Sequence, residues 1–343
     1  MSTPRLLSVI VPCRNERDYV DAFVDAVLAQ RLPDGWTMEV LVADGASDDG
    51  TREQLARRAA ADARIVLVDN PRRIVSTGLN ACLGRARGGV AARLDVHTTY
   101  APDYLAQCIA VLERTGADNA GGPWVAQGRT PMQRAVAAAF QCRWVVGGAR
   151  SRDERHEGEV DSVYLGCWPR ATFDRFGTFD EALVRNQDDE HNLRIRLGGG
   201  RVWQSAAIKS VYWPRAALGP LFSQQRQYGY WRPFVLRRHG QPGSPRQLVP
   251  ALFVAALTAG ALAAPWAGIA PLAGLLATYG AYLAVVAVSV ACATPAGARA
   301  GLLSRLPAVV AAYHVGYGVG TWQGLWALVR GVGPARNAVE LTR

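Results

Sequence analysis

Lysine is almost absent from this chain of 343 residues: Lys209 is the only one, so arginine carries nearly all of the positive charge. Basic residues outnumber acidic ones by 38 to 28, which gives a net charge of +10. That balance favours anionic partners such as nucleotide diphosphates or phospholipid head groups. The sequence has no zinc-ligand spacing, no RNP-type aromatic motif and no long basic run. These absences argue against a nucleic-acid partner.

Cysteine pairs of the CxxC type are also missing. The six cysteines are scattered along the chain, at Cys13, Cys82, Cys108, Cys142, Cys167 and Cys292. Scattered cysteines indicate buried thiols in a reducing compartment better than a disulfide framework or a metal site. No signal peptide precedes the first strand-like segment, so we expect the N-terminal part to stay in the cytoplasm.

Charge is missing altogether from residues 248–293. About 20 apolar residues make one helical crossing of a bilayer, so this stretch predicts two membrane spans, at about 248–267 and 271–293. Arginines flank the pair on both sides, and the positive-inside rule places both flanks in the cytoplasm. They are Arg237, Arg238 and Arg246 before it and Arg299 and Arg305 after it.

A second uncharged stretch, residues 306–329, is less apolar because it contains His314, Gln323 and several glycines. It is expected to form a third span or a re-entrant or interfacial helix. We assign residues 1–240 to a cytoplasmic domain and residues 241–343 to the membrane segment.

The first 240 residues alternate short apolar runs with helix-like segments. The runs at residues 6–12, 39–43, 65–69 and 90–94 are typical of buried strands. Strands that alternate with helices predict an α/β domain with a mostly parallel sheet. Ligands bind such sheets at the carboxyl ends of the strands, where Asn15, Asp44 and Asp95 fall.

Asp95 and His97 lie two residues apart in the loop after the fourth of these strands. A carboxylate and an imidazole at this spacing could hold one divalent cation that bridges to a diphosphate. The alternative is that Asp95 caps a turn and His97 is an ordinary loop histidine.

Several ordered motifs resemble those of one enzyme family. Residues 8–16 (SVIVPCRNE) are similar to VSVIVPxxNE, residues 44–51 to DxxSxDxT, residues 78–80 to GxN, and residues 95–97 to DxD with histidine last. On these motifs, the first 240 residues resemble the family 2 inverting glycosyltransferases, which have the GT-A fold. The ExoA-type succinoglycan glycosyltransferases are the members most similar in pattern, because they too carry a C-terminal membrane segment.

The resemblance implies a set of site residues. Asp188 takes the position of the catalytic base, in a stretch where Gln187 replaces the usual glutamate. The nucleotide sugar is expected at Pro12, Asn15, Glu16, Asp44, Asn80 and Asp95, and the metal, Mn²⁺ or Mg²⁺, at Asp95 and His97. Gln187, Gln225, Arg226 and Tyr228 are expected at the acceptor and diphosphate, the last three in a degenerate QxxRW motif. The alternatives are a solvated acidic helix start at Asp188 and a plain interfacial helix around Tyr228.

The implied activity is transfer of a hexose, glucose from a UDP-linked donor, to a lipid-linked saccharide in exopolysaccharide or cell-envelope glycan synthesis. Such an enzyme would sit in the inner membrane with its catalytic domain in the cytoplasm. One alternative is an enzyme that loads a sugar directly onto polyprenyl phosphate. Another is a non-catalytic membrane scaffold that keeps a nucleotide-binding fold.

Overall fold

The structure is a computed structural model, and it describes residues 5–332. The chain forms two compact units, Met1–Val125 with Asp153–Tyr212 and Ala126–Arg152 with Trp213–Arg343. The helices of the first unit are α1 (Val20–Leu28), α2 (Thr51–Ala61), α3 (Val75–Arg85), α4 (Tyr104–Thr115), α6 (Arg170–Phe176) and α7 (Gln187–Leu197). Its strands are β1 (Arg5–Cys13), β2 (Trp36–Asp44), β3 (Ile65–Asp69), β4 (Val90–Arg93), β5 (Thr98–Tyr100), β6 (Asn119–Gly122), β7 (Gly158–Glu159), β8 (Tyr164–Pro169), β9 (Val202–Gln204) and β10 (Ser210–Tyr212).

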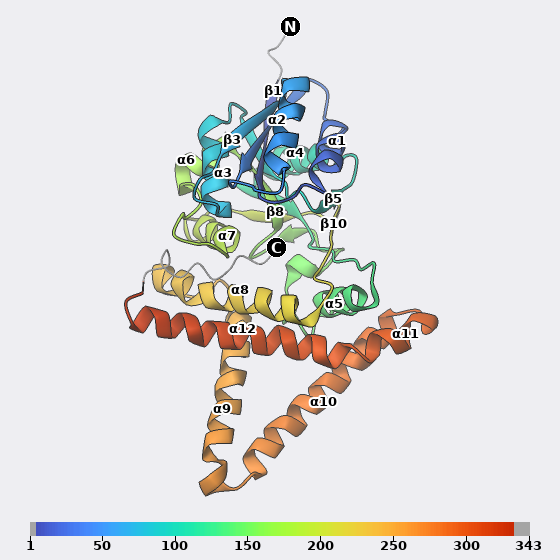
Figure 1. Cartoon of the computed structure of the whole chain (residues 1–343), viewed down its shortest axis with the longest axis vertical. Helices are drawn as coiled ribbons and strands as arrows, with labels where there is room; N and C mark the ends of the chain where they lie inside the picture. The colour runs from blue at the N-terminus through green and yellow to red at the C-terminus, as the bar shows by residue number, and fades with distance from the viewer. Residues whose placement is uncertain (1–4, 333–343) are drawn as a thin grey trace. The chain divides into compact units, whose positions relative to one another are not determined.

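The first unit is built on an eight-stranded sheet with the order β3-β2-β1-β4-β8-β6-β9-β7. Helices of this unit, among them α1, α2 and α3, lie around the sheet in Figure 1. The four strands predicted from the sequence, β1 to β4, are mutually parallel neighbours, which confirms the mostly parallel α/β fold. The sheet is mixed beyond β4, because β8 runs antiparallel to both β4 and β6. A small second sheet pairs β5 with β10.

Helices cover both faces of the large sheet, since its central strands are apolar on both sides. In β1, Leu7 and Val9 point into a core that α1, α2 and α4 close. Ile10 points the other way, into a core that α3, α6 and α7 close. This sandwich fixes the carboxyl edge of β1, β2 and β4, where the candidate site residues lie.

The second unit is helical. It contains α5 (Pro131–Gln141), a 3₁₀ turn at Arg150–Arg152, α8 (Leu218–His239), a 3₁₀ turn at Pro245–Leu248, α9 (Val249–Ala267), α10 (Ala270–Ala293), α11 (Ala296–Leu303) and α12 (Leu306–Val329). Helices α8 and α12 lie along each other (Figure 1). Glycines of both helices lie at the contact. A Cβ atom added at Gly320 would lie 2.0 Å from the carbonyl oxygen of Arg226, so only glycine permits this approach.

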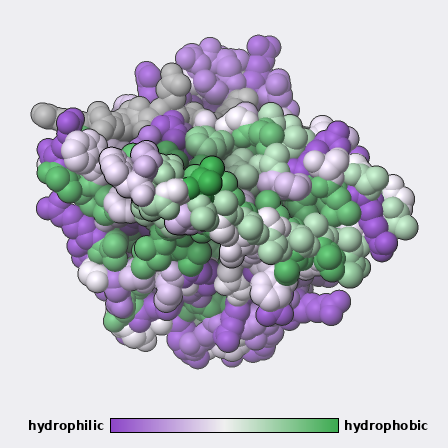
Figure 2. Space-filling model, turned by 90° about the horizontal axis from the view of Figure 1, so that it is seen from below, coloured by the Kyte–Doolittle hydropathy of each residue, from purple (hydrophilic) through white to green (hydrophobic). Residues whose placement is uncertain are grey.

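Helices α9 and α10 are exposed along most of their length. Of the described residues, only the stretches Pro245–Ala267 and Ala270–Ala293 are helical, long and apolar enough to cross a membrane. Both agree with the predicted spans, whereas α12, the third candidate, is not among them. The exposed side chains include Leu252, Leu262, Trp266 and Ile269. Figure 2, which views the molecule from below, shows patches of hydrophobic residues among hydrophilic ones on this face.

Candidate active site

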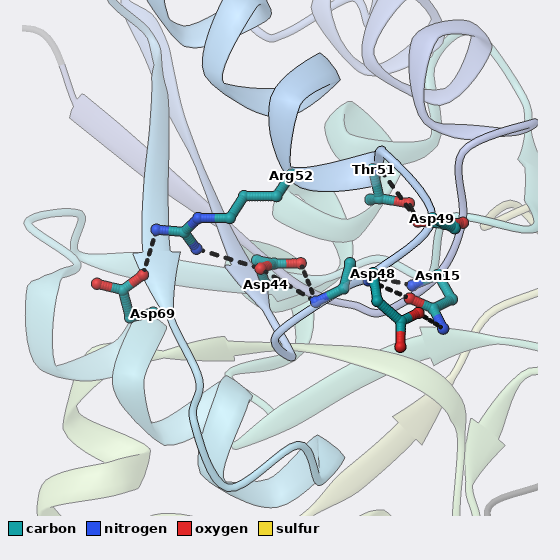
Figure 3. A network of polar contacts seen from close by, with 8 residues as sticks. Asn15, Asp44, Asp48, Asp49, Thr51, Arg52 and Asp69 are labelled. Carbon is teal, nitrogen blue, oxygen red and sulfur yellow. Dashed lines mark hydrogen bonds and ion pairs between the residues drawn. The ribbon is translucent and has the colours of Figure 1, made fainter.

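Two loops at the carboxyl edge of the sheet are fastened to each other by side-chain hydrogen bonds (Figure 3). The loop after β1 and the loop after β2 are neighbours because their strands pair in parallel. The Asn15 amide donates to Asp48 at 2.9 Å and accepts from the Asp48 N–H at 3.1 Å. The Asn15 N–H donates to the Ser47 hydroxyl at 3.0 Å. Asn15 has a φ of 53°, a conformation that asparagine tolerates better than most residues.

Asp44 is buried at the end of β2 and forms an ion pair with Arg52. The Arg52 guanidinium spans two carboxylates, with 3.1 Å to Asp44 and 2.7 Å to Asp69 (Figure 3). The N–H of Ser47 also approaches the Asp44 carboxylate, at 3.3 Å. The carboxylate is therefore held in one orientation at the sheet edge, beside the loop that carries Asn15.

Glu16 is held by the same two loops, and Pro12 lies just before them, near the end of β1. The N–H of Glu16 donates to the Thr51 hydroxyl at 2.8 Å, and that hydroxyl donates to Asp49 at 2.6 Å. Partial burial opposes ionisation of Asp49, but the hydrogen bonds from Thr51 prevail and lower its pKa. Pro12 pairs with Ala43 in the register of β1 and β2. The predicted nucleotide residues of the first two motifs thus share one edge of the sheet.

Asn80 has a different environment. Its amide nitrogen donates to the carbonyl oxygen of Phe179 at 2.8 Å, and its amide oxygen accepts from the Phe179 N–H at 3.0 Å. A second donation reaches the Glu181 carboxylate at 3.1 Å. These contacts favour a structural role for Asn80, in which it fastens the segment before α7 to α3. Its predicted contact with the nucleotide stays a prediction.

Asp95 follows β4 and is joined to Asp188 by a single arginine. Arg93 donates from Nε and Nη2 to the two Asp95 oxygens, at 3.1 Å and 3.2 Å. Its Nη1 lies 3.6 Å from Asp188 Oδ2. The carboxylates predicted to serve the metal and the acceptor therefore flank the same guanidinium.

Tyr100 fixes the backbone of the Asp95 loop. Its hydroxyl accepts from the Asp95 N–H at 2.7 Å and donates to the Asp95 carbonyl oxygen at 2.9 Å. Burial, and then the nearby Asp95 carboxylate, raise the pKa of Tyr100 well above its ordinary value, so the hydroxyl keeps its proton.

Asp188 lies in the first turn of α7, which begins after Asn186 in a left-handed conformation at φ 62°. Its Oδ1 accepts from the Asp189 N–H at 3.0 Å, and Asp189 accepts from the Ser162 hydroxyl at 2.9 Å. Burial raises the pKa of Asp188, Arg93 lowers it and Asp189 raises it, so that the net shift is upward. A raised pKa near a predicted acceptor site suits a general base.

The predicted acceptor residues are divided between the two units. Gln187 begins α7 and is buried, and its Oε1 has no hydrogen-bond partner among the described residues. Gln225, Arg226 and Tyr228 lie on α8 of the second unit. Gln225 is buried, and Arg226 donates to Gln323 of α12 at 3.4 Å. The role of these four residues stays a prediction.

The donor atoms near Asp95 fit a cation that takes its remaining ligands from a substrate. Residues 5–332 contain no group of three or more His, Cys, Asp or Glu side chains able to hold a metal. Mg²⁺-type sites often use only one or two carboxylates together with phosphate oxygens. Asp95 keeps lone pairs beyond those that Arg93 uses. His97 is 46% exposed, and its Nδ1 lies 3.7 Å from Glu16 Oε1. Metal binding by Asp95 and His97 stays a prediction.

Arg93 and Tyr100 were not among the predicted site residues. Arg93 did carry a signal, because a charged side chain at the end of an apolar run must find a counter-ion when the strand is buried. Tyr100 carried none, since its contact depends on the fold of the loop.

Comparisons with known proteins identify the family of the chain. Residues 8–168 match the sequence model of Glycosyl transferase family 2. The succinoglycan biosynthesis protein ExoA of Rhizobium meliloti (strain 1021) is 31% identical over 296 residues, which cover 83% of this chain and 89% of that protein. The putative teichuronic acid biosynthesis glycosyltransferase TuaG of Bacillus subtilis (strain 168) is 35% identical over 138 residues, 39% of this chain and 53% of that protein.

A solved structure shares the fold. The mannosyltransferase PcManGT from Pyrobaculum calidifontis, in complex with GDP-Man and Mn²⁺, has a TM-score of 0.56 at 21% identity, covering 95% of this chain and 88% of that one. That likeness concerns the arrangement of strands and helices, which is the GT-A arrangement expected from the sequence. With the identity to ExoA extending over most of both proteins, the chain belongs to glycosyl transferase family 2.

Proposed function

We propose that this chain is an inverting hexosyltransferase that extends a lipid-linked saccharide during exopolysaccharide or cell-envelope glycan synthesis. The donor in this proposal is a nucleotide-diphosphate sugar, UDP-glucose. Membership of family 2 and the similarity to ExoA support the reaction class and the glycan. The single observation that carries the proposal is the Arg93 guanidinium, which brings Asp95 and Asp188 to one site.

The chain's own residues account for binding at the sheet edge. Asp44 is buried and paired with Arg52, and Asn15 is held by its hydrogen bonds to Asp48. In this proposal both side chains are therefore held in place where the nucleoside binds. Asp95 and His97 would hold a divalent cation, and the Mn²⁺ bound to PcManGT supports this choice. Such a cation, when bound, neutralises charge on the departing diphosphate.

Asp188 removes the proton from the acceptor hydroxyl as that oxygen attacks the anomeric carbon. Base assistance of this kind contributes about 10²- to 10⁴-fold in rate. At the start of α7, the Asp189 N–H holds the Asp188 carboxylate in place, and the Ser162 hydroxyl in turn donates to the Asp189 carboxylate. One displacement inverts the anomeric centre, so an α-linked donor gives a β-linked product.

The membrane helices explain how a lipid-linked acceptor reaches the enzyme. Helices α9 and α10 cross the inner membrane in this proposal, and the catalytic domain lies in the cytoplasm. The arginines that flank the hairpin then remain on the cytoplasmic side, where anionic head groups attract them. Gln225, Arg226 and Tyr228 contact the acceptor or the diphosphate.

Labelled nucleotide sugars test the function. Membranes that contain the chain are incubated with a panel of UDP- and GDP-hexoses, and the organic phase is treated with mild acid. Extension of a lipid-linked saccharide releases an oligosaccharide one hexose heavier than the acceptor, from UDP-glucose and not after Asp188→Asn. Release of a free monosaccharide would instead identify a polyprenyl-phosphate glycosyltransferase. No product from any donor would leave the scaffold alternative.

A further inference from the structure

Arg93 is a buried cation whose bonds are shared unequally between two carboxylates. Its side chain is 8% exposed at the end of β4. Both oxygens of Asp95 receive a hydrogen bond from it, at 3.1 Å and 3.2 Å. The Nη1 group, in contrast, is 3.6 Å from Asp188 Oδ2, which is an ion-pair distance too long for a hydrogen bond.

The Nη1 group of Arg93 is therefore an unsatisfied hydrogen-bond donor. It is buried and has no hydrogen-bond partner in the part of the chain that the structure describes. A buried donor without a partner costs about 1–3 kcal/mol. The Arg93 guanidinium thus makes two hydrogen bonds to the Asp95 carboxylate but only a longer ion pair with the Asp188 carboxylate.

Hydrogen bonds hold the backbone of Asp95 and the carboxylate of Asp188 in place, so the long arginine side chain is the part able to shift. Tyr100 holds the Asp95 backbone through two hydrogen bonds. The Asp189 N–H holds Oδ1 of Asp188, which leaves Oδ2 facing the guanidinium. A movement of Arg93 toward Asp188 would satisfy Nη1 without disturbing either anchor.

We propose that Arg93 occupies the Asp95 carboxylate in the absence of a divalent cation and turns to Asp188 when the cation binds. This inference rests on the proposed metal role of Asp95. A dication and a bidentate guanidinium repel each other across one carboxylate, so binding of the first weakens the bonds of the second. Arg93 is then a positioning residue: it aligns Asp188 once the donor site is filled, and it competes with the cation before that.

Titration of the purified full-length chain with Mn²⁺ alone, followed by the electron paramagnetic resonance signal of the free ion, tests the competition. Arg93→Met removes the competitor and is expected to tighten Mn²⁺ binding about tenfold, roughly 1.4 kcal/mol. A merely structural role in shaping Asp95 predicts the opposite sign. Arg114→Met is the matched control, since it removes the same charge from an exposed pair with Glu157.

Arg93→Lys guards against misfolding of the methionine variant. Lysine keeps the charge but lacks the planar fork, so Mn²⁺ binding should tighten by a smaller factor. Weakened or unchanged binding in both Arg93 variants would overturn the proposal, and so would equal tightening in Arg114→Met. Absence of Mn²⁺ binding in wild type and variants alike would overturn it through the metal role itself, even if transfer from UDP-glucose were observed.

The second readout is the pH profile of transfer from UDP-glucose. Asp188 acts as a base only when ionised, and Arg93 favours the ionised form. Arg93→Met should therefore lower kcat more than it changes KM, and shift the acid limb of kcat to higher pH. A variant that bound Mn²⁺ more tightly but kept the wild-type acid limb would contradict the positioning role.

Discussion

Individual side chains show where the sequence was informative and where it was not. Motif spacing placed Asn15, Asp44 and Asp95 at strand ends, and the structure has them there. The side-chain contacts made at those strand ends could not be predicted from the sequence. Arg93 and Arg52 each bridge two carboxylates that come from different segments, and such a bridge depends on which loops the fold brings together. Asn80 illustrates the same limit, because its partner Phe179 lies far along the chain.

His191 makes a residue-scale prediction about acid stability. It is fully buried beside Phe173 and Phe179, donates from Nε2 to the Gly177 carbonyl oxygen, and has no hydrogen-bond partner at Nδ1 among the described residues. Burial, and to a lesser degree Arg194, lower its pKa to about 4. The unfolded chain takes up the proton near pH 6.5, while the folded chain does not until about pH 4.

Stability is therefore expected to be complete above pH 6.5 and to fall as the pH drops from 6.5 toward 4. Linkage gives a loss of about 2 kcal/mol from this group between pH 7.5 and pH 5. His191→Phe cannot take the proton, so its apparent Tm should fall less than that of the wild type over the same interval. Equal losses in the two proteins would show that His191 does not cause the acid sensitivity.

Some strands could be predicted from the sequence, and others could not. Periodicity and apolar runs predicted β1 to β4 and their parallel orientation, because each is a continuous run that alternates with a helix-like segment. The antiparallel strand β8 was not predicted. It inserts between β4 and β6, and nothing local in residues 164–169 specifies those neighbours. Short strands such as β7 and β10 depend on tertiary pairing in the same sense.

Packing of α8 against α12 gives an element-scale prediction. Gly320→Leu would force a side chain against the Arg226 carbonyl oxygen and separate the two helices. Overpacking of this kind costs about 1–3 kcal/mol or more. We expect a clearly lower apparent Tm in detergent. Gly280→Leu on α10 is the matched control, because a Cβ atom there meets nothing within 4 Å. The packing argument would be wrong if both variants melted alike.

At the scale of the whole molecule, the two compact units do not follow a single cut in the sequence. Residues 126–152 cluster with the C-terminal helices, and so does α8, although both precede residue 240. The division into compact units reflects contacts between residues and does not show where a membrane segment begins. The assignment of residues 241–343 to the membrane therefore stays a prediction. The uncharged stretches did predict both long exposed helices, since composition and length alone define them.

The central claim is that Asp95 and Asp188 serve one site in different roles, the first in binding the cation and diphosphate and the second in removing a proton. Calorimetric titration with UDP in the presence of Mn²⁺, paired with the transfer assay, tests it most directly. Asp188→Asn should bind UDP as the wild type does while transfer falls by about 10²- to 10⁴-fold. Asp95→Asn should lose both Mn²⁺-dependent UDP binding and transfer. Wild-type transfer by Asp188→Asn, or Mn²⁺-dependent UDP binding that survives in Asp95→Asn, would contradict the account.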